Sequence, residues 1–395
     1  MSAQGGLDHD VLIVGAGLPG LALALALRGS GLRVALVDRQ QPAVDDAAPW
    51  DTRIYAISPG NAHFLHAIGV WSRMDRERLT PIETMRVFGD RAGAQLDFSA
   101  FDGGVRALAW IVEQRELMAA TLAAWADADL PETIYADSPP LALLRERDGS
   151  SVKLEDGTLL SARLVVGADG LRSWTRSQAG MGGNLRAYGQ TAVVANFTTE
   201  LAHHGRAWQW FQPDGGILAW LPLPGRRMSI VWSAPEARAQ ELLALTDGEL
   251  AVTVAAAGAS VLGRLELLTP TASFPLTFMR LASPVAPRLA LIGDAAHGIH
   301  PLAGQGLNLG YADVEVLAGI LRERGAIGDP GSNLLLGRYA RTRALPTLAM
   351  QAVTDGLWRL FNARQGLPGV VRNRGMAVLN RLPMVKSILM QPAMR

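Results

Sequence analysis

The sequence predicts an α/β fold with three parts: a domain assembled from separated segments, an inserted antiparallel β-sheet domain, and a helical C-terminal region. Three observations predict it. A glycine-rich turn, Gly15–Gly20, lies between a short apolar strand and a buried helix. Aromatic-rich strands between residues 208 and 232 are separated by turns that contain proline and glycine. After about residue 335 the pattern is helical to the end of the chain.

The first part opens as a β-α-β unit. Residues 11–14 form a short apolar strand, residues 21–27 a buried Leu/Ala-rich helix, and residues 33–37 a second strand. Residues 164–166 and 289–292 are further apolar strands, each followed at once by a Gly/Asp turn. Strands so far apart in the chain indicate one sheet built from separated segments. The predicted domain comprises residues 1–80, 102–180 and 275–337.

The second part is an inserted sheet. Residues 208–211, 217–223 and 228–232 read as strands, with Pro-Asp-Gly-Gly at 213–216 and Pro-Gly at 224–225 between them. Such turns join neighbouring strands of an antiparallel sheet. We expect this domain to comprise residues 81–101 and 181–274. The C-terminal helical region comprises residues 338–395, with expected breaks at Pro346, Pro368 and Pro383.

The composition excludes several classes of protein. Of 395 residues, 49% are hydrophobic and only 18% are charged, which excludes an intrinsically disordered chain. The chain contains no cysteine, which excludes disulfides, thiolate chemistry, zinc–cysteine sites and iron–sulfur clusters. Any redox chemistry therefore requires a bound cofactor. No histidine belongs to a carboxylate-rich set at metal-ligand spacing, so we expect no metal site.

The turn Gly15-Ala-Gly-Leu-Pro-Gly20 has the pattern of a dinucleotide site. Its glycines allow a tight turn and a close approach to a pyrophosphate, and the following helix offers free N–H groups and the positive end of its dipole. Asp38 ends the second strand, 18 residues after Gly20, where an acid would hydrogen-bond an adenosine ribose. Together these features predict a Rossmann-type dinucleotide site. The alternative is an ordinary β-α turn.

Three further motifs carry groups that suit such a cofactor. Arg53 follows the first β-α-β unit, and Asp169 stands in a Gly-Ala-Asp-Gly turn; alone, Arg53 suits a surface ion pair, and Asp169 also suits fixing a neighbouring loop. Asp294 closes a strand in Gly-Asp-Ala-Ala-His, and Gly304 and Gly306 then open a helix. A helix N-terminus aimed at a flavin would stabilise the negative charge of the reduced ring.

Together these motifs resemble those of the single-component flavin aromatic hydroxylases, which have the para-hydroxybenzoate hydroxylase fold. The run His300–Asp313, HPLAGQGLNLGYAD, resembles the ubiquinone-biosynthesis FAD-dependent hydroxylase branch more closely, as do segments 114–117, 221–223 and 339–343. The likeness leaves out only the first eight or nine residues. It implies a Rossmann-type FAD-binding domain of discontinuous segments and an inserted antiparallel-sheet domain that binds substrate.

The resemblance implies roles for the matched residues. Gly15, Gly17 and Gly20 would cradle the FAD pyrophosphate, and Asp38, where the family often has Glu, would hold the ribose. Pro301 would lie beside the reacting face of the flavin. The other cofactor-binding residues would be Arg39, Arg53, Arg115, Asp169, Asp294, Gly304, Gly306, Leu307 and Asn308, and the catalytic set would be Pro301, Gly304 and Gln305.

The resemblance also implies an FAD-dependent monooxygenase. NAD(P)H would bind transiently, because the sequence has a single GxGxxG, and the reduced flavin would form a C4a-hydroperoxide with dioxygen. That species would hydroxylate the aromatic ring of a polyprenylated phenol or quinol in ubiquinone biosynthesis. Two alternatives stay open. The first is a flavin enzyme with another substrate: either a flavin hydroxylase of a soluble phenolic compound or a lipid-saturating flavin reductase. The second is an FAD-bearing lipid-binding scaffold of a quinone-synthesis complex.

The strands of the inserted sheet indicate a neutral, lipophilic substrate. They carry Trp210 and Trp220 among several large aromatic residues, either as an apolar pocket wall or as ordinary sheet core. They have no Arg or Lys outside a turn, which disfavours a charged aromatic acid. His300 suits a residue that structures its loop, and the alternative is a proton carrier. The predicted substrate contacts are Trp210, Trp220, Pro222 and His300.

The net charge of +1 conceals an asymmetry. Residues Arg338–Arg395 contain ten basic side chains and one acid, Asp355, together with apolar residues such as Leu357. We expect this segment to contact an anionic membrane or other quinone-synthesis proteins, or else to pair with acids of the chain's own body. The uncharged run 11–27 contains three glycines and a proline and follows acidic residues, so we expect no signal peptide or membrane span. The expected location is cytoplasmic, or peripheral on the inner membrane, without a nucleic-acid partner; a homodimer is one open arrangement.

Overall fold

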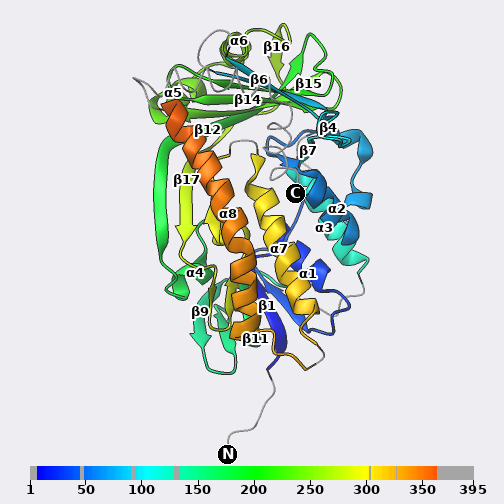
Figure 1. Ribbon diagram of the computed structural model, residues 1–395, viewed down its shortest axis with the longest axis vertical. Coiled ribbons are helices and arrows are strands. Elements are labelled where there is room, and N and C mark those ends of the chain that lie inside the picture. The colour runs from blue at the N-terminus through cyan, green and yellow to red at the C-terminus, as the bar shows by residue number, and fades with distance from the viewer. Residues whose placement is uncertain are drawn as a thin grey trace, which may run out of the picture.

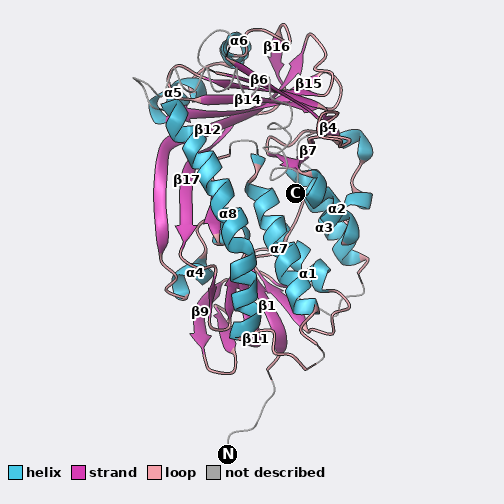
Figure 2. Ribbon diagram, in the orientation of Figure 1, coloured by secondary structure: helices cyan, strands magenta, loops and turns pink. Residues whose placement is uncertain are grey.

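Figure 1 shows the computed structural model of the chain, which describes residues 7–44, 49–89, 94–128, 134–301, 304–325 and 327–362. Within these residues the strands form three sheets, of eight, nine and three strands. Figure 2 shows the two larger sheets at opposite ends of the molecule, with helices between and around them. The long strands β12 (Gly183–Thr199) and β17 (Ala272–Leu281) extend between the two ends. This is the α/β architecture that the sequence predicts.

The eight-stranded sheet contains the predicted β-α-β unit. Its strand order is β18-β19-β11-β1-β2-β8, and β1 pairs in parallel with both β2 and β11. The strands predicted at 11–14, 33–37, 164–166 and 289–292 therefore share one sheet. Its members are β1 (His9–Val14), β2 (Val34–Val37), β8 (Ile134–Tyr135), β9 (Pro140–Arg145), β10 (Ser150–Leu154), β11 (Leu159–Gly167), β18 (Val285–Ala286) and β19 (Leu289–Leu291).

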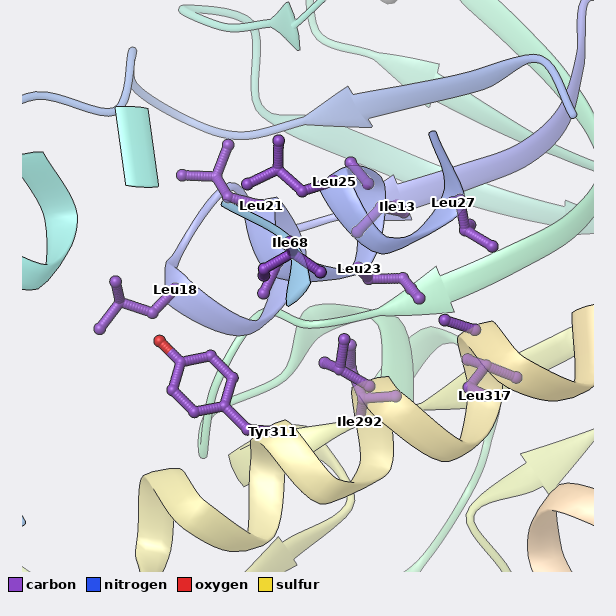
Figure 3. Packing of buried hydrophobic residues seen from close by; sticks show 14 of the residues in the cluster. Ile13, Leu18, Leu21, Leu23, Leu25, Leu27, Ile68, Ile292, Tyr311 and Leu317 are labelled. Atoms are coloured by element: carbon purple, nitrogen blue, oxygen red, sulfur yellow. The ribbon is translucent and has the colours of Figure 1, made fainter. Parts of the chain in front are cut away.

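Helix α1 (Leu18–Leu27) begins directly after the glycine turn and is apolar on all sides. A helix of this kind is buried on every face. It packs between the sheet, helix α3 (Gln114–Ala126) and helix α7 (Gly306–Arg322). Figure 3 shows Leu21 of α1 in the same cluster as Ile292 and Tyr311. This packing holds the glycine turn beside the N-terminus of α7.

The nine-stranded sheet is formed mostly by antiparallel pairs, and its order is β20-β17-β12-β15-β14-β13-β5-β6, with β16 beside β12. Helices α5 (Glu236–Leu243) and α6 (Asp247–Ala257) contribute to the hydrophobic cluster on one face of this sheet. The remaining members are β5 (Thr84–Phe88), β6 (Gln95–Ser99), β13 (Arg206–Phe211), β14 (Ile217–Leu223), β15 (Arg227–Pro235), β16 (Leu265–Leu267) and β20 (His297–Gly298).

A small three-stranded sheet lies between the larger ones, with β7 paired to both β3 and β4. The domain boundaries inferred from the sequence stay a prediction. The elements still to be placed are β3 (Ile54–Ile57), β4 (Thr80–Ile82), β7 (Ala109–Glu113), α2 (Pro59–Ala67), α4 (Trp174–Gln178), α8 (Asn333–Asn362), and the short 3-10 helices η1 (Trp71–Arg73), η2 (Arg76–Arg78) and η3 (Gly293–Ala295).

Helix α8 corrects the prediction of a break at Pro346, because it continues through that residue. A proline inside a helix costs about 3 kcal/mol, since it removes a hydrogen bond and crowds the preceding turn. Here the ring is exposed, and contacts on both sides hold the helix: Arg343 binds Asp313 at 2.6 Å, and Gln351 donates to the carbonyl oxygen of Met279 at 2.8 Å. The predicted breaks at Pro368 and Pro383 lie outside the described residues.

Candidate active site

A cavity of about 1400 Å³ connects the glycine turn of the parallel sheet with the inner face of the nine-stranded sheet. Small-molecule sites usually measure about 300–1,000 Å³, so this cavity has room for a large cofactor together with a second ligand. Its walls come from both large sheets, from the N-terminal turn of α7 and from α8. Residues far apart in the sequence therefore share one site.

The glycine turn has the geometry of a phosphate cradle. Gly15 has a φ of +110°, and a Cβ there would lie 2.5 Å from the carbonyl oxygen of Ala168. A Cβ on Gly20 would lie 1.9 Å from the carbonyl oxygen of Gly15, whereas a Cβ on Gly17 would meet nothing within 4 Å. Gly17 also precedes α1 as its N-cap, without a side-chain cap. The first and third glycines are thus required by packing, and the second leaves the helix N-terminus open to an anion.

Asp38 lies at the end of β2 and lines the cavity beside Arg39. One carboxylate oxygen accepts a hydrogen bond from the backbone N–H of Ala16 at 2.6 Å, and the other accepts from the N–H of Arg39 at 2.6 Å. The side chain therefore closes the glycine turn as well as facing the cavity. Its predicted contact with a ribose stays a prediction.

Residues at and just before the N-terminus of α7 form another wall of the cavity. Pro301, Gly304, Gln305, Gly306 and Leu307 all line it. Gly304 has a φ of +64°, and a Cβ there would lie 3.2 Å from the Cβ of Ala56, so both the backbone conformation and the packing favour glycine. The predicted catalytic residues are thus brought together at one helix N-terminus, whose dipole favours negative charge.

Asn308 has a different position from the one predicted. It is buried and does not belong to the cavity wall. Its side-chain oxygen accepts from the N–H of Ser58 at 3.0 Å, and its amide nitrogen donates to the carbonyl oxygen of Ala56 at 2.8 Å. Asn308 therefore anchors α7 to β3 and α2, and the structure replaces the predicted cofactor contact with this bridging role.

Two acidic residues of the predicted motifs face the cavity. Burial among protein atoms raises the pKa of Asp294, although the charges of His297 and Arg53 oppose the shift. Asp169 also lines the cavity, but its carboxylate accepts from the hydroxyl of Ser173 at 2.5 Å and from the N–H of Thr175 at 2.8 Å. Asp169 thus holds the start of α4, which is the loop-fixing role that the sequence left open.

A buried ionic cluster supports the strand end at Asp294. Asp313 accepts from His297 Nε2 at 2.6 Å, from Arg343 Nε at 2.6 Å and from the N–H of Gly293 at 2.9 Å. Burial alone would raise the pKa of Asp313, but the charges and hydrogen bonds of His297 and Arg343 lower it below its ordinary value. Sequence reasoning did not identify this role of Arg343, because the three elements meet only after folding.

The two predicted cofactor arginines are placed differently. Arg53 lines the cavity on the loop before β3. Arg115 is not part of the wall: its backbone N–H donates to Asp51 at 2.9 Å, and its guanidinium donates to the carbonyl oxygen of Pro49 at 2.9 Å. These contacts order the loop that carries Arg53. The predicted direct contact of Arg115 with the cofactor is not supported by this geometry.

The structure corrects the predicted substrate wall. Trp210 and Trp220 pack in the hydrophobic core between the sheet and α6, with ring centroids 5.1 Å apart, and do not line the cavity. Pro222 and His300 are also absent from the wall, and His300 binds Gln190 at 3.1 Å. The sheet-core interpretation is therefore the one that holds for the tryptophans. The residues of the nine-stranded sheet that do line the cavity are Met85, Val87, Leu96, Phe98, Val194, Gln209, Phe211, Ala219, Leu221, Val231, Phe274, Pro275, Leu276, Thr277 and Gly298.

Helix α8 contributes a wall that sequence reasoning missed. Its residues Ala352, Val353, Gly356, Leu357 and Leu360 line the cavity at helical spacing. This spacing is visible in the sequence, where it suits a membrane surface as well as packing against the chain's own body. Leu357 and Leu360 both line the cavity.

Three basic side chains of α8, those of Arg338, Arg343 and Arg359, form ion pairs with acids. Arg338 binds Glu323 at 2.8 Å, and Arg359 binds Asp355 at 2.8 Å. The pairs of Arg338 with Glu323 and of Arg343 with Asp313 are of the kind that the second interpretation expects, whereas Arg359 pairs within its own helix. No helix in the described part of the chain has the length and apolarity needed to cross a membrane. Among the described residues, no group of three or more His, Asp and Glu side chains is placed to hold a metal ion.

The FAD binding domain family matches residues 8–354 of the chain. A ubiquinone hydroxylase of Rhodospirillum rubrum, UbiL, is 38% identical over 98% of this chain and 89% of its own length. The 3-demethoxyubiquinol 3-hydroxylase of Escherichia coli is 34% identical over 95% and 96%, and the ubiquinone biosynthesis monooxygenase COQ6 of Xenopus tropicalis is 31% identical over 99% and 94%.

Solved structures agree with this result. PqsL of Pseudomonas aeruginosa superposes with a TM-score of 0.77 at 25% identity, covering 93% of this chain and 99% of PqsL. The p-nitrophenol 4-monooxygenase PnpA of Pseudomonas putida gives 0.78 at 19% identity over 98% of both chains, which shows the shared fold. With the glycine cradle and the α7 turn in place, the chain belongs to the FAD-dependent hydroxylases of ubiquinone biosynthesis and is an FAD-dependent aromatic monooxygenase.

Proposed function

We propose that this monooxygenase hydroxylates the aromatic ring of a polyprenylated phenol or quinol, with NAD(P)H as a transient electron donor and dioxygen as co-substrate. The observation that carries the proposal is that one cavity has both an anion cradle and an apolar wall. The relatives support it, since one is a ubiquinone hydroxylase and another is a 3-demethoxyubiquinol 3-hydroxylase.

FAD supplies, when bound, the reduction of dioxygen and the transfer of one oxygen atom to the ring. In this chain Gly15 and Gly17 would bind its pyrophosphate, and Asp38 and Arg39 are available at the adenosine end. The N–H groups of the α7 turn at Gly304–Leu307 would favour the negative charge of the reduced cofactor. These assignments follow from which residues line the cavity.

The apolar end of the cavity supports a neutral, lipophilic substrate. Its described walls from the nine-stranded sheet and α8 contain no Lys, Arg, Asp or Glu, so a carboxylated ring would find no counter-ion there. A wall of this kind also excludes water, which protects oxygen transfer from unproductive release of peroxide. Both properties favour a prenylated ring over a small aromatic acid.

Oxygen uptake tests this proposal. NAD(P)H oxidation and oxygen consumption by the purified protein should rise when a prenylated phenol is added, and less so with phenols that carry no chain. Purified protein without flavin, or oxygen uptake that yields no hydroxylated product, would contradict it. Mass spectrometry of the quinone intermediates that accumulate in a deletion strain would then identify the substrate and the ring position.

We also propose that the basic C-terminal segment brings the protein to an anionic membrane, where a polyprenylated substrate resides. Residues 363–395 lie outside the described part of the chain and contain six basic side chains and no acid. Each Lys or Arg near such a surface adds about 1 kcal/mol of attraction. A chain that ends at Asn362 should sediment less with anionic liposomes than the full chain does, and undiminished sedimentation would refute the role of this segment.

A further inference from the structure

One row of residues crosses the inner face of the nine-stranded sheet and lines the cavity from one side to the other. Gln209 on β13 pairs with Ala219 on β14 and with Val87 on β5. The pairing continues outward to neighbouring strands, and every member of the row lines the cavity. The row runs Leu96, Val87, Gln209, Ala219, Val231 and Val194. Gln209 is its single polar member.

The side chain of Gln209 is buried and, among the described residues, has no hydrogen-bond partner. It is 6% exposed, and its amide takes part in none of the side-chain hydrogen bonds of the described structure. Two other glutamines nearby behave differently: Gln190 donates to the carbonyl oxygen of Gly215 at 3.0 Å, and Gln212 donates to that of Ala257 at 3.4 Å. The amide of Gln209 is not among the fully buried polar atoms that lack a partner, and it lies in the cavity wall, so a ligand in the cavity can reach it.

The surroundings of Gln209 leave the cavity as the place where its partner would lie. Its strand neighbours Trp208 and Trp210 point to the opposite face of the sheet, into the core under α6. Ala219 beside it is small, and the flanking Val87 offers no polar atom. A ligand in the cavity would therefore meet one amide in an apolar surface, which is how small-molecule sites fix the orientation of a ligand.

We propose that Gln209 is the substrate-binding residue that orients the aromatic ring, through a hydrogen bond between its side-chain amide and an oxygen substituent of the ring. The amide both donates and accepts, so it can bind a hydroxyl, a methoxy or a quinone oxygen. The apolar remainder of the row and the α8 wall would contact the ring face and the prenyl chain. This inference rests on the proposed substrate class, and it adds the residue that sets the orientation of the aromatic ring in the cavity.

A comparison of two ligands that differ only in the ring oxygen tests the role of Gln209. The ligands are 2-farnesylphenol and farnesylbenzene, and their affinities for the resting, oxidised holoprotein are measured by isothermal titration calorimetry in detergent. Gln209→Met keeps the length of the side chain and removes the amide. Gln212→Met is the matched control, because that glutamine lies outside the cavity wall. Thermal unfolding of both variants checks that the sheet is intact.

Wild-type protein and Gln212→Met should bind the phenol about 3- to 10-fold more tightly than the hydrocarbon, as expected for one net hydrogen bond. In Gln209→Met this preference should fall to near 1, while the affinity for farnesylbenzene is retained or improved. If Gln209→Met still prefers the phenol over the hydrocarbon, the role of Gln209 is wrong, while the proposed substrate class stands. If the wild type binds neither ligand, the proposed substrate class fails and the inference fails with it.

Discussion

Gly17 and Gly20 of the glycine turn should respond in opposite ways to the same added methyl group. In Gly20→Ala the new Cβ would lie 1.9 Å from the carbonyl oxygen of Gly15, where ordinary contact begins at about 3.4 Å. Helix α1 and the turn must therefore separate by about 1.5 Å. Overpacking of this kind costs about 1–3 kcal/mol or more, which exceeds the ~1 kcal/mol that alanine gains over glycine inside a helix.

In Gly17→Ala the same methyl group would meet nothing within 4 Å. The residue has a φ of −74°, which alanine adopts without strain. The free energy of unfolding of the apoprotein should therefore change by no more than about 0.5 kcal/mol. The methyl group would instead occupy the space through which the pyrophosphate approaches the backbone, so flavin content should fall sharply.

Two measurements separate these effects. Thermal unfolding of flavin-free protein reports the packing, and the flavin-to-protein absorbance ratio of the purified protein reports the cradle. Gly20→Ala should lower the melting temperature of the apoprotein, whereas Gly17→Ala should lower only the flavin ratio. The reasoning would be refuted by a Gly17→Ala protein that retains full flavin, or by a Gly20→Ala apoprotein as stable as the wild type.

Three further predictions follow from the site. Burial lowers the pKa of His300 to about 3, so this side chain stays neutral in the folded protein while it is protonated below about pH 6.5 when unfolded. The free energy of unfolding should therefore decline as the pH falls from about 6.5 towards 3. Measured by chemical denaturation, this decline should be shallower in His300→Gln than in the wild type. Equal slopes for the two proteins would contradict the assignment. Gly356→Leu on α8 adds a side chain where a Cβ meets nothing within 4 Å, in the cavity wall. It should leave flavin content unchanged and weaken binding of long-chain phenols more than of short ones in a titration series, and equal weakening would count against the α8 wall. Trp210→Leu should destabilise the protein by about 1–3 kcal/mol in urea unfolding without altering the order of preference among phenols, because its ring lies in the core under α6.

Much of the architecture could be predicted from local sequence patterns. The glycine turn depends on backbone conformations within six residues, and the short apolar strands are bounded by their own turn residues. The antiparallel strands around 208–232 follow from their aromatic content and from the turns with proline and glycine between them. Each of these signals is local, so each can be recognised without knowing which residues it contacts in the folded protein.

Contacts between distant segments could not be predicted in this way. Alternation along β13 assigns Trp210 and Phe211 to opposite faces, but only the packing of α5 and α6 decides which face becomes core and which becomes cavity. The break expected at Pro346 did not occur because Arg343 and Gln351 anchor α8 on both sides. Whether Asn308 faced the cofactor or its own helix's neighbours depended likewise on where β3 and α2 packed.

The sequence by itself therefore determined the cradle for the cofactor, the order of the elements and the family to which the chain belongs, because these are encoded in short, contiguous patterns. The tertiary structure decided which side chains the substrate would meet. That assignment depends on which face of each strand and helix is covered by another element, and such coverage is a property of the packed molecule. Gln209, in an apolar row that spans several strands, is the residue for which this difference matters most.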